Sequence, residues 1–328
     1  MNKKFFNVGI IGCGIIGQKR AEALNYMQRA KLVACADINV IKAEKIAKIS
    51  GAKIFKEWRD LIKSTDIDLV IIATPHNLLA EICSEAINSR KHVLVEKPAG
   101  ICASQLDALI LATSKYGVKV RVGLNHRHHR SIRKAKELVD KGELGELMFI
   151  RGRYGHGGRI GYEKEWRANK EISGGGELID QGPHLIDLSR WFLGEITEVN
   201  GFAHTYFWNM PVDDNSFMLL KTKKKQVAFL HVSCTEWKNL FSMEIYGKLG
   251  KLDISGLGGS YGLEKITWYK MLKEMGPPET VSWEFPMADN SWTTELLEFF
   301  NDIEFNRVVS PSLIDAQITL RIIEKIYK

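Results

Sequence analysis

Residues 6–17 read FNVGIIGCGIIG, an apolar strand-like run that leads directly into the loop G-x-G-x-x-G. A helical pattern follows over residues 18–27, with apolar side chains recurring on one stripe. In this order of strand, loop and helix, Gly12 makes a tight turn, Gly14 lets the backbone approach a pyrophosphate, and Gly17 allows close packing of the helix. The amide groups and dipole of the helix N-terminus favour the phosphates. The predicted dinucleotide-binding residues of this loop are Gly12, Gly14, Ile15, Ile16 and Gly17.

A second apolar strand, residues 31–36, ends in Asp37, about twenty residues past Gly17. The dinucleotide motif has at this point an acidic residue that binds the adenine ribose. A carboxylate accepts hydrogen bonds from both ribose hydroxyls and repels a 2′-phosphate, and Ile38 and Asn39 offer no arginine to compensate. We therefore expect NAD as the cofactor, with NADP as the alternative, because some enzymes with an acid here accept both by moving the side chain.

Strand-like and helical runs alternate through residues 1–122, which we expect to form one domain. The strands, such as residues 69–73 and 92–95, are nearly continuous in valine, isoleucine and leucine. This pattern predicts a doubly wound parallel sheet that helices cover on both faces. Ligands of such sheets bind beyond the carboxyl ends of the strands. The predicted cofactor-binding residues at these ends are Thr74, Pro75, Glu96 and Lys97.

The pattern changes in residues 123–328, which we expect to form a second, α+β domain with a mostly antiparallel sheet. Helices are expected over residues 131–141, 293–306 and 313–327. Lys223-Lys224-Lys225 lies between two strand-like runs and is typical of a solvated hairpin turn. The predicted strands are residues 148–154, 199–207, 216–221, 226–233, 242–247 and 265–269.

Three consecutive glycines, Gly174-Gly175-Gly176, allow a sharp turn or a close approach of the backbone to a ligand. The apolar periodicity over residues 178–192 predicts one amphipathic helix, on which Asp180 and His184 share a face. A carboxylate that can hold an imidazole is typical of a proton-transfer pair. Taken alone, the same residues also fit a helix with an acidic first turn and a surface histidine.

The composition is that of a globular protein of two domains, with 328 residues and a formal net charge of +7. The lysines are scattered and form no basic stripe, so we expect no nucleic-acid partner. The five cysteines contain no C-x-x-C pair, which favours free thiols over disulfides or a metal site. Residues 8–16 imitate the apolar part of a signal peptide, but glycines interrupt the run. No run is long enough to span a membrane, so we expect a cytoplasmic protein.

Taken together, these motifs resemble the glucose–fructose oxidoreductase and inositol dehydrogenase (Gfo/Idh/MocA) family along essentially the whole chain. The resemblance implies a Rossmann domain, a second domain with a large open antiparallel sheet, and sheet-to-sheet association into a homodimer or homotetramer. It also implies NAD(P)-dependent oxidation or reduction of a sugar, cyclitol or sugar-nucleotide carbon. The matching pieces are residues 12–17, Ala73-Thr74-Pro75, residues 91–98, Trp166-Arg167 and residues 174–184. The chain departs from many members at His76, Leu79 and Arg90.

The resemblance implies that Lys97, Asp180 and His184 surround the reacting carbon. Histidine titrates near neutral pH, so His184 is the expected general acid/base. Lys97 would hydrogen-bond the same oxygen and favour its alkoxide-like form, while Asp180 would orient the substrate or the other two groups. Two alternatives stay open: glycoside cleavage through transient oxidation, and a non-catalytic nucleotide sensor.

Further residues are candidates for substrate contact. Asn125 and Arg127 follow the last strand of the first domain, where a structural role is equally consistent with the sequence. A basic approach formed by Arg153, His156, Arg159 and Arg167 predicts either a site for an anionic substrate group or a solvated loop. The complete set of predicted substrate-binding residues is Lys97, Asn125, Arg127, Arg153, Trp166, Arg167, Asp180 and His184.

Overall fold

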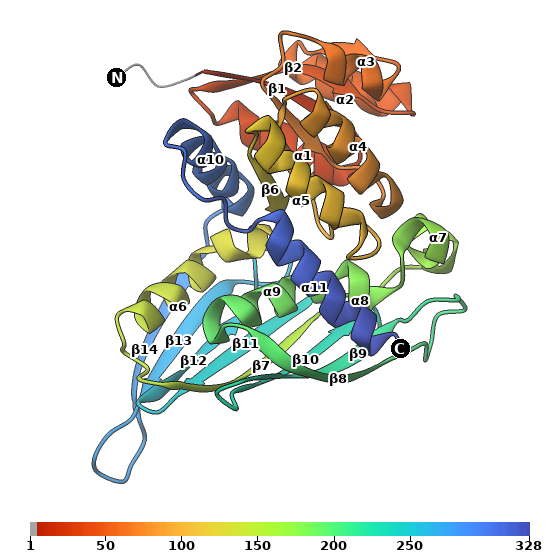
Figure 1. Ribbon diagram of the computed structural model, residues 1–328. Coiled ribbons are helices and arrows are strands. Elements are labelled where there is room, and N and C mark those ends of the chain that lie inside the picture. The colour runs from red at the N-terminus through yellow and green to blue at the C-terminus, as the bar shows by residue number, and fades with distance from the viewer. Residues whose placement is uncertain (1–4) are drawn as a thin grey trace. The chain divides into compact units, whose positions relative to one another are not determined.

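The computed structural model describes residues 5–328, and over this range the chain forms two compact units (Figure 1). The described part of the first unit comprises residues 5–124 and Trp292–Leu320, and the second unit comprises Asn125–Ser291 and Arg321–Lys328. Residues 292–320, which the sequence analysis assigned to the second domain, therefore belong to the first unit. Over the described range, none of the helices combines the length and apolar character needed to cross a membrane.

The described part of the first unit contains six parallel strands in the order β3-β2-β1-β4-β5-β6. The strand order reverses between β1 and β4, which is the switch point where ligands bind in doubly wound sheets. All four residues of β4 are buried, as expected for a strand with helices on both faces. The predicted parallel fold is thus confirmed. The strands are β1 (Phe6–Ile11), β2 (Ala30–Ala36), β3 (Lys53–Phe55), β4 (Leu69–Ile72), β5 (His92–Glu96) and β6 (Val120–Gly123).

The helices of the first unit follow local signals in the sequence. Asn39 caps α2 by accepting a hydrogen bond from the Ile41 amide, and Gly51 ends that helix in the left-handed conformation. The helices are α1 (Ile15–Asn25), α2 (Val40–Ser50), α3 (Trp58–Lys63), α4 (His76–Asn88), α5 (Gln105–Tyr116), α10 (Ser291–Glu304) and α11 (Leu313–Ile326), of which the last two also contribute residues to the second unit.

Helix α10 joins the first unit through contacts between residues far apart in the sequence. The ring of Phe300 stacks on that of Phe6, with centroids 4.8 Å apart. Arg20 donates to Glu295 at 2.5 Å, across 275 positions of the chain. No local pattern could reveal these contacts, which explains why the sequence analysis placed residues 292–320 in the other domain.

In the described part of the second unit, eight strands form one sheet in the order β14-β13-β12-β11-β7-β10-β9-β8. The pairs are antiparallel except β7 with β10, so the expected mostly antiparallel sheet is confirmed. Two of these strands, β12 and β14, were missing from the sequence prediction. The strands are β7 (Leu147–Gly155), β8 (Ile196–His204), β9 (Asn215–Thr222), β10 (Val227–Ser233), β11 (Leu240–Gly247), β12 (Gly250–Ser255), β13 (Glu264–Lys270) and β14 (Glu279–Phe285).

Helices α6 (Arg130–Asp140), α8 (Glu177–Asp180) and α9 (Gly182–Leu193) lie on one face of this sheet (Figure 1). The prediction of one continuous helix over residues 178–192 was wrong. The helix breaks at Gln181, and Pro183 stands in the first turn of α9. Proline there lacks the amide that would continue α8, so Asp180 and His184 lie on two successive helices.

Side chains that point to the other face of the sheet are partly exposed, and the described chain places no helix there (Figure 1). Phe202, Leu219 and Phe229 are 67%, 50% and 48% exposed. They lie on the neighbouring strands β8, β9 and β10, where Leu219 pairs directly with Phe229. This surface is called the open face below.

Candidate active site

Two of the three glycines in the loop after β1 are required by the packing of the chain, and the third borders open space. Gly12 has φ +91°, and a Cβ there would lie 2.5 Å from the Ala73 carbonyl oxygen. A Cβ at Gly17 would lie 2.0 Å from the carbonyl oxygen of Gly12. At Gly14, by contrast, a Cβ would meet no described atom within 4 Å. Gly12 and Gly17 are therefore required by the fold, whereas Gly14 borders open space through which a ligand could approach the backbone.

Asp37 lies directly beside this loop. Its carboxylate accepts hydrogen bonds from the Cys13 amide at 2.7 Å and the Asn39 amide at 2.7 Å. These bonds hold the carboxylate at the end of β2, where the dinucleotide motif requires the ribose-binding acid. The arrangement thus fits the cofactor expected from the sequence.

Thr74 and Pro75 connect the end of β4 to α4, with Pro75 at the N-cap position. The buried Thr74 Oγ1 and Asn77 Oδ1 have no hydrogen-bond partner within residues 5–328. Buried polar atoms are normally satisfied, so these two fit a polar ligand at this strand end. Helix α1 also begins at Ile15 and Ile16 without a side-chain cap among the described residues.

The side chain of Glu96, a predicted cofactor-binding residue, pairs with other groups of the chain. Its Oε1 accepts a hydrogen bond from Arg20 Nε at 2.8 Å, and Arg20 is fully buried. Arg20 also pairs with Glu295 at 2.5 Å. Glu96 is therefore part of a buried ion network inside the first unit. Lys97, the next residue, is half-buried directly after β5.

In the second unit, the glycine triplet packs against the chain itself. Gly174 has φ +82° and ends helix α7 (Lys170–Ser173). A Cβ at Gly175 would lie 2.2 Å from the Tyr327 hydroxyl, and one at Gly176 would lie 1.8 Å from the Asp213 carbonyl oxygen. Gly175 and Gly176 are therefore required by internal packing, and Gly174 makes the sharp turn that the sequence allowed.

Asp213 fixes the start of α8. Its carboxylate accepts hydrogen bonds from the amides of Gly176 at 2.9 Å and Leu178 at 2.7 Å. Its backbone carbonyl accepts the Glu177 amide at 2.9 Å, and the Tyr327 hydroxyl donates to Oδ1 at 2.7 Å. These bonds satisfy the orphan amides of the helix and orient the side chains that α8 carries.

Asp180 and His184 are both buried, each with 4% exposure. Asp180 Oδ2 accepts a hydrogen bond from Arg167 Nε at 2.9 Å. The His184 ring stacks on His126, with centroids 3.7 Å apart and an interplanar angle of 27°. The rings of Tyr154 and His184 pack edge to face, with centroids 5.8 Å apart. His126 and Tyr154 were not among the predicted site residues, although the run of histidines after β6 was a visible signal.

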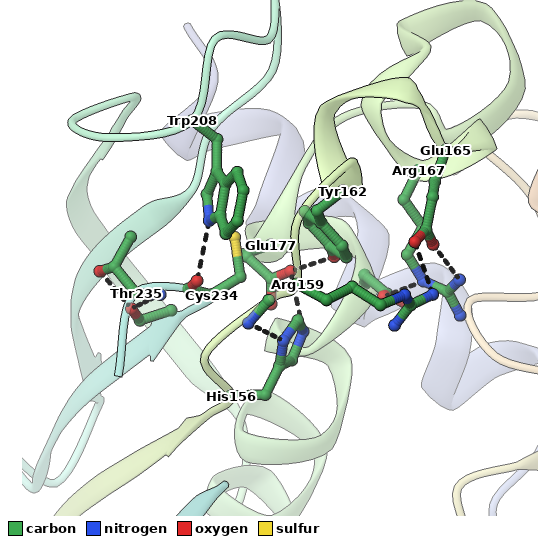
Figure 2. A network of polar contacts seen from close by, with 12 residues as sticks. His156, Arg159, Tyr162, Glu165, Arg167, Glu177, Trp208, Cys234 and Thr235 are labelled. Atoms are coloured by element: carbon green, nitrogen blue, oxygen red, sulfur yellow. Dashed lines mark hydrogen bonds and ion pairs between the residues drawn. The ribbon is translucent and has the colours of Figure 1, made fainter. Parts of the chain in front are cut away.

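A network beside Asp180 is shown in Figure 2. Its centre is Glu177, 2% exposed, whose Oε1 accepts the Tyr162 hydroxyl at 2.9 Å and lies 3.4 Å from His156 Nε2. Burial by itself lowers the pKa of His156, but the hydrogen bond and charge of Glu177, helped by Asp180, raise it overall. Glu177 and Tyr162 were not among the predicted site residues, although Glu177 directly follows the glycine triplet.

A pocket in the second unit joins this network to Asp180. Its lining contains two carboxylates, Glu177 and Asp180, and one arginine, Arg167. Asp180 pairs with Arg167. The lining residues are Tyr162, Arg167, Ser173, Gly175, Gly176, Glu177, Asp180 and Met210. Two of the predicted substrate residues, Asp180 and Arg167, are thus brought together. The Arg167 guanidinium carbon lies 4.5 Å from the centroid of the Trp166 ring.

Three other predicted substrate residues, Asn125, Arg127 and Arg153, are not among the lining residues of this pocket. Arg127 forms two hydrogen bonds with the buried Asp187, at 2.7 and 2.6 Å. Asn125 donates to Ser291 at 2.9 Å. Both residues therefore have structural partners within the second unit. Arg153 is exposed on the open face, because neighbouring side chains of a strand point to opposite faces and Tyr154 points inward.

The expected basic approach is largely neutralised by carboxylates of the chain. Arg159 pairs with Glu165 at 2.5 Å, while Arg167 pairs with Asp180 and His156 with Glu177. The Arg159–Glu165 and His156–Glu177 pairs are labelled in Figure 2. These three pairs cancel most of the positive charge on which a site for an anion would depend.

Two family models match the chain. The model of the oxidoreductase family with an NAD-binding Rossmann fold matches residues 6–124. The model of the GFO/IDH/MocA C-terminal domain matches residues 132–253.

Curated relatives include several dehydrogenases. Levoglucosan dehydrogenase of Pseudarthrobacter phenanthrenivorans is 29% identical over 228 residues, 66% of this chain and 58% of the relative. Inositol 2-dehydrogenase of Rubrobacter xylanophilus is 32% identical over 197 residues, 58% of this chain and 53% of the relative. Glucose-6-phosphate 3-dehydrogenase of Bacillus subtilis is 32% identical over 191 residues, 57% and 53% of the two chains. The matches thus span little more than half the length of these relatives.

Solved structures share the fold over nearly the whole chain. A levoglucosan dehydrogenase complex with NADH and levoglucosan has a TM-score of 0.90 at 23% identity, covering 99% of this chain and 96% of the other. An oxidoreductase domain protein from Kribbella flavida has a TM-score of 0.90 at 22% identity, covering 99% and 96%. Two models of one family match residues 6–124 and 132–253, and the chain therefore belongs to the GFO/IDH/MocA family of oxidoreductases.

Proposed function

We propose that this protein is an NAD(H)-dependent oxidoreductase that moves a hydride between the nicotinamide ring and an alcohol carbon of a sugar, cyclitol or sugar-nucleotide. The observation that carries the proposal is the glycine loop, in which Gly14 borders open space beside the carboxylate of Asp37. Relatives named levoglucosan dehydrogenase, inositol 2-dehydrogenase and glucose-6-phosphate 3-dehydrogenase support sugar or cyclitol alcohols as substrates.

The residues of the first unit would hold the cofactor. Asp37 binds the adenine ribose, and the amides of Gly14, Ile15 and Ile16 bind the pyrophosphate. Thr74 Oγ1 offers a hydrogen bond near the end of β4. When bound, the nicotinamide accepts or returns the hydride.

Three predicted residues would act on the hydroxyl group of the reacting carbon. His184 takes the hydroxyl proton as general base during oxidation and returns it as general acid during reduction. Lys97 donates a hydrogen bond to the same oxygen and stabilises its negative charge. Asp180, held by Arg167, orients the substrate.

The test is a screen of levoglucosan, myo-inositol, D-glucose, L-sorbose, glucose 6-phosphate and UDP-glucose for absorbance change with NAD and with NADP. We expect at least one of these alcohols to be oxidised, with tighter binding of NADH than of NADPH. His184→Ala should then lower hydride transfer about a hundredfold, the scale of losing a general base. Its affinity for NADH should stay within about twofold, because the cofactor contacts belong to the first unit.

Lys97→Ala should cost a comparable factor, and the double variant less than the product of the two, because both groups act on one oxygen. Asp180→Asn should be milder. No oxidation of any alcohol would contradict the proposed activity. Near-normal hydride transfer by the His184 variant would exclude that residue as the base.

We also propose that the chain forms a homodimer or homotetramer through the open face, where apolar side chains of three adjacent strands are exposed. A cytoplasmic location is proposed as well. All five cysteines, which lie within the described range, are free thiols, as is typical of a reducing compartment.

A further inference from the structure

The imidazole of His184 lies face to face with a second imidazole, that of His126. The centroids of the two rings are 3.7 Å apart, and their planes make an angle of 27°. Both side chains are buried. At this separation the rings are in direct contact, so the His126 ring limits how far the plane of the His184 ring can turn.

His126 is itself held in one orientation. It belongs to a short 3-10 turn, Asn125–His128. The amide of Asn125 is oriented by its nitrogen, which donates to Ser291 Oγ at 2.9 Å. Its oxygen therefore faces His126 Nδ1, at 3.4 Å. An amide oxygen only accepts, so Nδ1 of His126 carries a proton and donates it.

Other aromatic rings pack around His126. The rings of Tyr154 and His129 contact it edge to face, with centroids 4.9 and 5.5 Å away. The ring of Phe241 lies at 5.9 Å. His129 is fixed in turn by Glu264, whose Oε2 lies 3.3 Å from His129 Nδ1. His126 is therefore a rigid flat surface on which another ring can rest.

The catalytic role proposed for His184 needs such a surface. A general base must point its nitrogen at the proton that it takes, and a misplacement of about 1 Å can lower the rate about a hundredfold. Helix α9 fixes the backbone of His184, but the torsion that sets the plane of a histidine ring has only a broad intrinsic preference. Neighbouring side chains must therefore fix that plane.

We propose that His126 is a positioning residue whose stacked ring fixes the plane of the His184 imidazole and so aims its proton-accepting nitrogen at the substrate hydroxyl. The flat aromatic face of His126 performs this role, and its nitrogens serve only to hold His126 in place. The inference rests on the proposed function for the role of His184, but it concerns the orientation of that ring.

The first experiment compares two substitutions of similar size. His126→Phe keeps a flat aromatic face and removes both nitrogens, whereas His126→Leu fills the space without a flat face. Stopped-flow measurement follows hydride transfer to NAD from whichever of levoglucosan, myo-inositol and D-glucose reacts fastest. We expect His126→Leu to lower the rate about tenfold, the upper range for an aromatic pair. His126→Phe should stay within about threefold of the wild type, because stacking is retained.

The affinity for NADH should stay within about twofold in both variants, because the cofactor contacts belong to the first unit. The matched control is Phe149→Leu, which removes a similar stack on Tyr246, with centroids 4.2 Å apart, on strands β7 and β11. This control should transfer hydride like the wild type. Thermal unfolding of all three variants separates a loss of ring orientation from a loss of stability, since only the former distinguishes His126→Leu from His126→Phe in rate.

The second experiment needs no substrate. Nuclear magnetic resonance of protein labelled with ¹³C at histidine Cε1 reports the mobility of the His184 ring, whose signal is identified by its absence in His184→Gln. The ring should be rigid in the wild type and in His126→Phe. In His126→Leu its order parameter should fall below about 0.6, the value typical of flexible groups.

Equal rates for His126→Leu and His126→Phe would overturn the inference, and so would a His184 ring that stays rigid in His126→Leu. A ring that becomes mobile only in His126→Leu, in a protein that oxidises none of the alcohols, would support the stacking role and contradict only the proposed function.

Discussion

His156 is a residue whose charge depends on its surroundings. Its side chain is 18% exposed and lies 3.4 Å from Glu177. Burial and Arg167 lower its pKa, but Glu177 and Asp180 raise it, and the net change is upward. A raised pKa means that the folded protein favours the charged imidazole. This contribution to stability is present below the ordinary histidine value of about 6.5 and is lost as the pH rises through the higher folded value.

We therefore expect His156→Gln to destabilise the protein more at pH 6 than at pH 9. At pH 6 the loss should be about 1 kcal/mol, somewhat below the usual range for hydrogen bonds to charged groups, because the contact is long. Thermal unfolding at the two pH values checks this prediction. His204→Gln, at an exposed position, is the control. A larger loss at pH 9 for His156→Gln would show that the sign assigned to the shift is wrong.

Helix α10 is held in the first unit by a buried ion network. Arg20 lies between Glu96 and Glu295, and the exposure of its side chain is 0%. Burial raises the pKa of Glu295, although the charge of Arg20 opposes this change. The arginine is thus the group that keeps two buried carboxylates compatible with the folded state.

Arg20→Leu should destabilise the protein by about 3–5 kcal/mol, because it leaves Glu96 and Glu295 buried together without a cation. Denaturant unfolding of the variant measures the change. The matched control is Arg59→Leu, since the Arg59–Glu81 pair is about half exposed, at 49% and 50%. This control should change stability by about 0–1 kcal/mol. Similar losses in the two variants would contradict the assigned role of the network.

At the scale of the whole molecule, the open face is the feature that needs an explanation. Leu219 and Phe229 pair on adjacent strands and are each about half exposed, at 50% and 48%. Next to them, Phe217 stacks on His231, with centroids 4.4 Å apart. A contiguous apolar surface of this kind is typical of an association site.

If identical chains associate through this face, Leu219→Lys/Phe229→Lys should convert the oligomer to monomer, because four like charges would meet across a twofold interface. Light scattering at micromolar concentration measures the mass. Ile49→Lys, an exposed apolar residue of α2, is the control and should keep the mass of the wild type. A monomeric wild type, or an unchanged mass for the double variant, would rule out association through this face.

Local patterns made much of the fold predictable. Each of these patterns depends on residues that are close together in the sequence, so the sequence alone predicts the structure. They are the glycine loop, the apolar strands and the alternation of helix and strand. The turn at Lys223–Lys225 was also predicted, since β9 and β10 pair as a hairpin around it. Even the break before α9 had a local signal in Pro183, which the periodicity of the surrounding apolar residues concealed.

By itself, the sequence determined the parallel sheet, the dinucleotide loop with Asp37, and the presence of Asp180 and His184 in one segment. Only the tertiary structure decided which charges are neutralised. It paired Arg127 with Asp187, Glu96 with Arg20, and Arg167 with Asp180, and it turned Arg153 to the open face. The physical reason is that burial and ion pairing depend on groups brought together from distant parts of the chain. Backbone turns and periodicity, in contrast, depend only on neighbours.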